Sequence, residues 1–72
     1  MAKAEIINHI RRLRFDHDHM TQQQLADRVG CSRQTIVLLE QGRYSPSLAL
    51  AFRIARTFDF GVEEIFRYEA ET

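Results

Sequence analysis

Apolar residues recur every three or four positions along most of the chain, a spacing typical of amphipathic helices. The first such stretch runs from about Glu5 to Phe15 and carries Ile6, Ile10 and Leu13 on one face. Residues 16–19 then interrupt the pattern and are predicted to form a loop. No stretch alternates apolar and polar residues as a half-buried strand does. The pattern therefore predicts an all-α chain.

The next two helices have clear end signals. Thr21 is predicted to cap a second helix, and Gln24 three residues later completes a capping box. Gly30 ends that helix at a position where a left-handed backbone is usual. Ser32 is predicted to cap a third helix, which Gly42 terminates. Two short helices joined by a tight turn are therefore expected over about residues 21–41.

Two further helices are predicted in the last third of the chain. The segment 45–47 is expected to open the fourth helix, with Pro46 in its first turn. The predicted apolar face of this helix is Leu48, Ala51, Phe52, Ala55 and Phe58, with Ile54 beside them. The predicted apolar positions of a short fifth helix are Val62, Ile65 and Phe66. The tail, residues 69–72, is expected to fray.

Length and composition limit the classes of function. The chain has 72 residues, of which 44% are hydrophobic, which suffices for one small domain over residues 1–72 but leaves little room for an enzyme cleft. No apolar run approaches the roughly 18 residues of a membrane span, and no apolar signal segment stands at the start. Cys31 is the only cysteine, which rules out an intrachain disulfide and favours a reducing, cytoplasmic setting.

The charges are polarised although they sum to zero. Up to residue 43, seven basic residues face five acidic ones, and from residue 44 on three face five, which gives +2 and −2. Nine of the ten basic residues are arginine, whose forked guanidinium suits phosphate and guanine. A local basic patch can therefore contact DNA. Binding to non-specific DNA is expected to be weak, because few phosphates are neutralised.

The spacing within residues 21–41 is that of a helix-turn-helix. Ala26 supplies the small residue where the second helix crosses the third, and Gly30 supplies the backbone freedom of the turn. Ile36 and Leu39 anchor the third helix, while Leu25 and Val29 fill the core behind them. This set of residue types is far more specific than a generic pair of amphipathic helices.

The segment 21–36 resembles the Cro/C1-type (XRE) helix-turn-helix domain of phage repressors and bacterial regulators. Residues 40–48 are similar to the segment that follows the recognition helix in that family, and residues 51–55 and 62–66 resemble its last two helices. The resemblance implies a lambda-repressor-like five-helix bundle that docks its third helix in the DNA major groove. The loop before Thr21 looks one residue longer than the common one and lacks its usual glycine.

The resemblance also implies which residues contact DNA. Gln22 matches a position that contacts a phosphate, and Ser32, Arg33 and Gln34 open the recognition helix, whose first residues meet base edges. Arg33 can fork onto guanine and Gln34 onto adenine.

Four more candidates follow the start of that helix. Val37 and Leu38 lie one turn on, where they can contact a thymine methyl, or instead pack within the bundle or at a dimer seam. Gly42 and Arg43 match a loop whose backbone amides and basic side chain hold a phosphate.

The remaining notable residues have structural interpretations. By resemblance to a family salt bridge, Glu40 is expected to pair with Arg14. The loop residues His17 and His19 are expected to be solvated rather than to form a metal site, and Cys31 is expected to pack in the turn. The C-terminal aromatic residues are expected to be mostly core, with some of them joining Ile65 in a dimer contact; they are Phe52, Phe58, Phe60, Phe66 and Tyr68.

The sequence thus predicts a DNA-binding transcriptional regulator, specifically a repressor that binds double-stranded DNA as a homodimer. The alternative is a protein-interaction module, resembling an antitoxin or a co-regulator, in which DNA contact is secondary. No catalytic constellation, metal site, cofactor or small-molecule ligand is predicted, so an enzyme is not expected.

Overall fold

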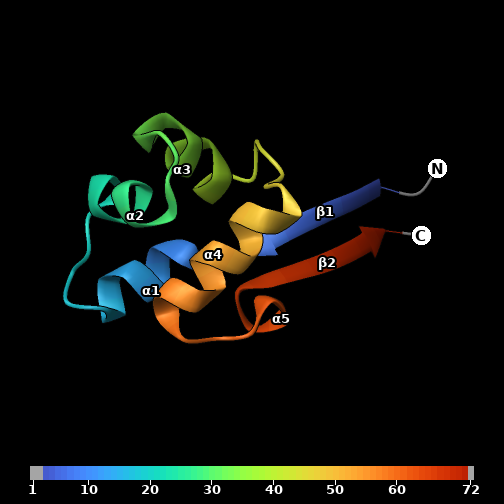
Figure 1. Ribbon diagram of the computed structural model, residues 1–72. Helices are drawn as coiled ribbons and strands as arrows, with labels where there is room; N and C mark the ends of the chain where they lie inside the picture. Colours follow the sequence, from blue (N-terminus) through green and yellow to red (C-terminus); the bar gives the residue numbers. More distant parts are fainter. Residues whose placement is uncertain (1–2, 72) are drawn as a thin grey trace.

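The computed structural model describes residues 3–71 and combines five helices with a two-stranded ribbon. The helices are α1 (Ile10–Asp16), α2 (Gln22–Val29), α3 (Arg33–Glu40), α4 (Leu48–Phe58) and α5 (Val62–Ile65). The strands are β1 (Lys3–Asn8) and β2 (Phe66–Glu71), which pair antiparallel. The helices pack together at one end of the molecule, and the ribbon projects from them with both chain ends at its far tip (Figure 1).

The prediction of an all-α fold is wrong at both ends of the chain. The helix expected over residues 5–15 begins only at Ile10, and the tail expected to fray continues as β2 to Glu71. In the ribbon Ile6 stands opposite Tyr68, and Asn8 stands opposite Phe66. This pairing joins segments about sixty residues apart, so tertiary contact overrides the local helical pattern of the first segment.

The core lies among the helices and includes one residue of the turn before α2. Its fully buried large side chains come from every helix: Ile10, Leu25, Val29, Ile36, Leu39, Ile54 and Ile65. Met20, just before α2, is also buried, whereas Leu13, Val62 and Phe66 pack partly buried against the cluster. The described part of the chain contains no helix long and apolar enough to cross a membrane.

The start and the apolar face of α4 differ from the prediction. Ser47 is the N-cap, because its hydroxyl accepts a hydrogen bond from the amide of Leu50 at 3.1 Å, so Pro46 precedes the helix instead of lying in its first turn. The helix therefore turns a different stripe inward, which consists of Leu50, Ala51, Ile54, Ala55 and Phe58. Leu48 and Phe52, predicted to be buried, lie on the exposed side.

The C-terminal aromatic residues are mostly not core. Phe58 is buried and Phe66 partly so, but Phe52, Phe60 and Tyr68 are 51%, 43% and 70% exposed. Ile65 is fully buried and so has no surface to offer a second chain. The exposed aromatic residues are instead available for contacts outside the chain.

Candidate nucleic-acid interface

The helices α2 and α3 form the predicted helix-turn-helix. Thr21 and Gln24 make the capping box, with hydrogen bonds of 2.9 and 3.0 Å between each one's side chain and the other's amide. Gly30 follows α2 with a left-handed φ of 74°, and the amides of Gly30 and Cys31 both donate to the carbonyl of Ala26. Ala26 itself is fully buried, as the close approach of α3 requires. The turn predicted from the sequence is confirmed.

The start of α3 is fixed by Ser32. Its hydroxyl accepts from the amide of Thr35 at 3.1 Å and lies 2.9 Å from the Thr35 hydroxyl. Ile36 and Leu39 are buried on the inner side of α3, as predicted. This anchoring determines which side of α3 faces solvent.

A three-residue network ties α1, α2 and α3 together. The Nε and Nη2 atoms of Arg14 donate to the two carboxylate oxygens of Glu40 at 2.6 and 3.0 Å, so the predicted ion pair is confirmed. Gln22 also donates to Glu40, at 3.2 Å, and Arg14 donates through Nη1 to the carbonyl of Met20 at 2.8 Å. The predicted phosphate residue Gln22 is therefore held at the start of α2 by Glu40 at the end of α3.

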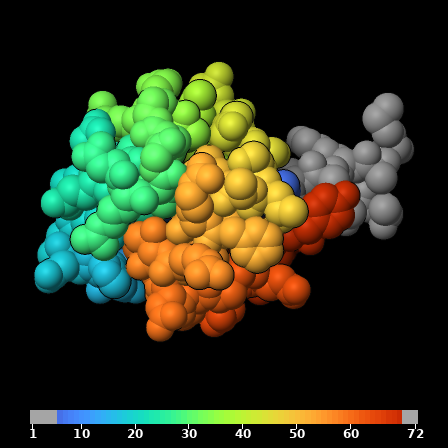
Figure 2. Space-filling model, in the orientation of Figure 1, coloured from blue at the N-terminus to red at the C-terminus, as the bar shows by residue number. Residues whose placement is uncertain are grey.

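The candidate base-contact residues differ in exposure. Arg33 and Gln34 are exposed, and neither side chain has a hydrogen-bond partner among the described residues. Val37 and Leu38 are half-buried, so part of each side chain is engaged with the protein. In Figure 2, α2 and α3 form one continuous surface over the upper left of the molecule.

The loop after α3 uses its backbone internally. The amide of Gly42, whose φ is 73°, donates to Leu39, and the amide of Arg43 donates to Leu38 at 2.9 Å. These two hydrogen bonds close the end of α3. The amides that the resemblance assigns to a phosphate are thus already occupied, whereas the side chain of Arg43 is exposed.

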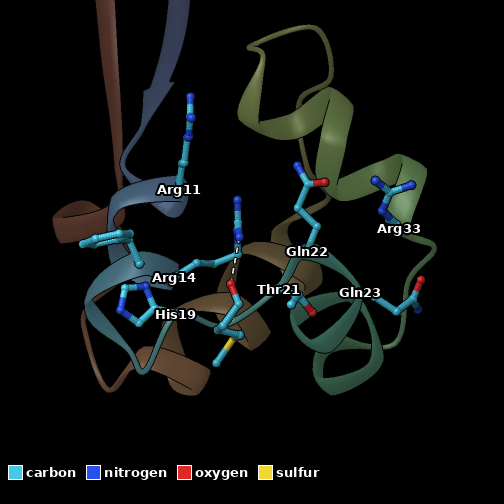
Figure 3. A pocket seen from close by; sticks show the side chains of 9 residues that line it. Arg11, Arg14, His19, Thr21, Gln22, Gln23 and Arg33 are labelled. Atoms are coloured by element: carbon cyan, nitrogen blue, oxygen red, sulfur yellow. Dashed lines mark hydrogen bonds between the residues drawn. The ribbon is translucent and has the colours of Figure 1, made fainter.

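An open groove runs from α1 across the start of α2 to α3. Its lining residues are Arg11, Arg14, Phe15, His19, Met20, Thr21, Gln22, Gln23 and Arg33, none of them acidic. Figure 3 shows the side chains of Arg11, Arg14 and Gln22 pointing to the same side. Sequence reasoning missed Arg11, because it lies ten residues before the motif and only the fold brings it near Gln22. The signal in the sequence that could have found it is the group of arginines at positions 11, 12 and 14, which lie between the apolar positions.

The histidines of the 16–19 loop pack on different aromatic rings. His17 meets Phe58 edge-on with ring centroids 5.7 Å apart, and His19 meets Phe15 at 4.5 Å. Asp18 and His19 both have left-handed φ values, 61° and 54°, in the loop that lacks the usual glycine. Among the residues described, no cluster of three or more potential metal-binding side chains occurs.

Cys31 packs against the core beside the turn. Burial raises the pKa of its thiol, and the nearby Arg53 guanidinium opposes this less strongly. A thiol with a raised pKa is a poor nucleophile. This environment agrees with a packing role.

Comparison with known proteins supports the motif. A family model described as Helix-turn-helix matches residues 10–65, more than half of the chain. A protein from Archaeoglobus fulgidus is 55% identical over 53 residues, covering 74% of this chain and 75% of its own length. One from Bacillus subtilis, YgzD, is 40% identical over 60 residues, covering 83% and 86%. Both are named as uncharacterized HTH-type transcriptional regulators.

The fold also matches a solved structure. A crystal structure of a candidate DNA-binding protein from Bacteroides fragilis superposes with a TM-score of 0.73 at 21% identity, covering 86% of this chain and 98% of that one. The chain therefore belongs to the Cro/C1-type (XRE) helix-turn-helix family of transcriptional regulators. The strands β1 and β2 lie outside the matched range 10–65.

Proposed function

We propose that this protein is a sequence-specific DNA-binding repressor that reads the major groove with α3 and acts as a homodimer. The observation that carries the proposal is the two-sided character of α3. Ile36 and Leu39 fix its inner side in the core, while Arg33 and Gln34 extend unpartnered from its first turn. A rigid helix with free, forked polar groups at its start is what base readout requires.

The residues around α3 have distinct roles in the proposal. Arg33 and Gln34 read base edges, and the exposed parts of Val37 and Leu38 contact thymine methyl groups. Gln22 and Arg43 contact phosphates on either side. Ser32 caps α3 and lies at the same surface, whereas Gly42 shapes the turn that presents Arg43.

The groove extends the phosphate contacts beyond the motif. Arg11 lines it together with Gln22 and Arg33, and no carboxylate lines it. Because an arginine on the duplex backbone adds affinity without sequence information, Arg11 contributes to positioning rather than to readout. The homodimer supplies specificity, since one helix reads only a few base pairs and two half-sites multiply the discrimination.

The test compares DNA binding with protein binding for the same face. The Arg33→Ala/Gln34→Ala variant and an Arg56→Ala control, which alters the last turn of α4, are titrated against duplex DNA containing a selected site. We expect the double variant to lose discrimination between that site and scrambled DNA, while the control retains it. Unchanged discrimination would contradict the proposal. It would favour the alternative, in which this face binds another protein.

A further inference from the structure

We propose that the β1–β2 ribbon is the dimerisation element, and that a second copy of the chain pairs along the free edge of β2. The ribbon would be the surface through which the proposed homodimer forms. The pairing itself does not depend on the proposed function; only the binding of the dimer to DNA rests on it. The ribbon lies outside the part of the chain that matches the helix-turn-helix family. The DNA-binding core that the family shares therefore does not by itself account for the ribbon.

The ribbon is incomplete as a sheet. In the part of the chain that the structure describes it has two strands, and it projects away from the helices (Figure 1). Such a ribbon is marginally stable by itself in water, and each outer edge presents unpaired backbone donors and acceptors. One face also exposes apolar surface, because Ile6 and Tyr68 are register partners and are 38% and 70% exposed. These features indicate a covering partner.

The edge of β2 is the more open of the two. At its inner end β1 is tied to α3, since the side-chain amide of Asn8 donates to the carbonyl of Leu39 at 2.8 Å. In Figure 1 the loop between α3 and α4 lies over this side of the ribbon, whereas the outer edge of β2 faces away from α3. Because only the β2 edge pairs, the assembly is complete with two copies and does not grow into a filament.

The sequence of β2 is complementary to itself. If two β2 strands pair antiparallel about a two-fold axis at Tyr68, Arg67 of each copy stands opposite Glu69 of the other. The same register places the two Tyr68 residues opposite each other and Phe66 opposite Ala70. Opposite charges and aromatic pairs across antiparallel strands are both stabilising. Moving the two-fold axis by one residue, from Tyr68 to Glu69, would instead set Glu69 opposite Glu69.

Within one chain, Arg67 and Glu69 are exposed and available. Their side chains are 68% and 53% exposed, and they form an ion pair with each other at 3.8 Å. An exposed pair at that distance contributes little stability. Replacing this internal ion pair by two ion pairs between the copies therefore costs each copy little stability.

A charge exchange tests the pairing. Sedimentation velocity over a concentration series, without DNA, compares the unaltered protein with the variants Arg67→Glu and Glu69→Arg. Circular dichroism checks that each variant folds. We expect the unaltered chain to dimerise. Each variant places two like-charged pairs at the interface, so its dissociation constant should rise about tenfold or more. An equimolar mixture of the two variants restores every attractive pair and should recover the heterodimer.

Each outcome bears on the proposal. Recovery in the mixture cannot come from misfolded variants, so it supports β2 pairing in this register. An unaltered chain that stays monomeric, or an Arg67→Glu variant that dimerises as well as the unaltered chain, would overturn it. The Arg33→Ala variant serves as the matched control and should dimerise normally. If it does and DNA binding is nevertheless absent from every protein, the DNA-binding function fails while the dimer stands.

Discussion

The guanidinium of Arg14 in α1 donates hydrogen bonds to both carboxylate oxygens of Glu40 in α3, and the same carboxylate accepts a hydrogen bond from Gln22. The pair is largely buried, with side chains 14% and 7% exposed. It therefore joins α1 to the far end of α3 and positions Gln22 at the same time. This arrangement leads to a prediction on stability.

Glu40→Ala should reduce the free energy of unfolding by about 3 kcal/mol, because it leaves the Arg14 charge largely buried without its carboxylate. Replacing both residues with apolar ones, as in Arg14→Met/Glu40→Leu, should cost less than either of its single substitutions, Arg14→Met or Glu40→Leu. Urea denaturation compares Glu40→Ala, the double variant and these two single variants. Strictly additive losses in the double variant would show that the two side chains are not coupled.

Gly30→Ala should destabilise the protein by about 1 kcal/mol, since an L-residue resists the left-handed conformation of the turn. A steric clash is not the cause, because a Cβ added at Gly30 would meet nothing within 4 Å. Gly61→Ala is the matched control, because its φ of −74° suits any residue and its neighbour is the flexible Glu64 side chain at 3.3 Å. Thermal unfolding should show the larger loss at Gly30. The reverse order would contradict the turn geometry.

Arg33→Ala should cost about 1–3 kcal/mol in binding to a selected site and should relax the preference at one base position. Gln34→Ala should relax a different position. Fluorescence anisotropy against a panel of single-base variants of the site measures both effects. An equal loss on all sequences would reassign the residue to phosphate contact.

Arg11→Ala should weaken binding to specific and non-specific DNA alike and should lower the salt dependence of the binding constant by about one unit of log–log slope. Its groove position beside Gln22 and Arg33 is the reason. Arg56→Ala, in the last turn of α4, is the matched control and should leave the slope unchanged. Equal slopes for both variants would remove Arg11 from the interface.

Local signals predicted the helix-turn-helix well. The capping box at Thr21, the left-handed Gly30 and the Ser32 cap all depend on residues within a few positions of one another, so the sequence contains their whole explanation. The Arg14–Glu40 pair was expected only through the family resemblance, because 26 positions separate the two residues.

The ribbon and the buried face of α4 could not be predicted from local signals. Residues 3–8 have a composition and spacing compatible with a helix, and only the pairing with a segment at the other end of the chain makes them a strand. In α4, Leu48 and Phe52 form an apolar stripe as regular as the buried one at Leu50 and Ile54. Packing against the other helices selects between the two stripes, which periodicity alone cannot do.

Sequence-specific binding is tested most directly by selecting sites from a random duplex pool at about 150 mM salt, where non-specific phosphate binding is weak. A dimer that reads DNA with two copies of α3 should enrich a palindrome whose two half-sites lie about 10–10.5 base pairs apart, or a multiple of that spacing. A pool that shows no enriched sequence after repeated rounds would contradict the claim that this protein reads DNA sequence.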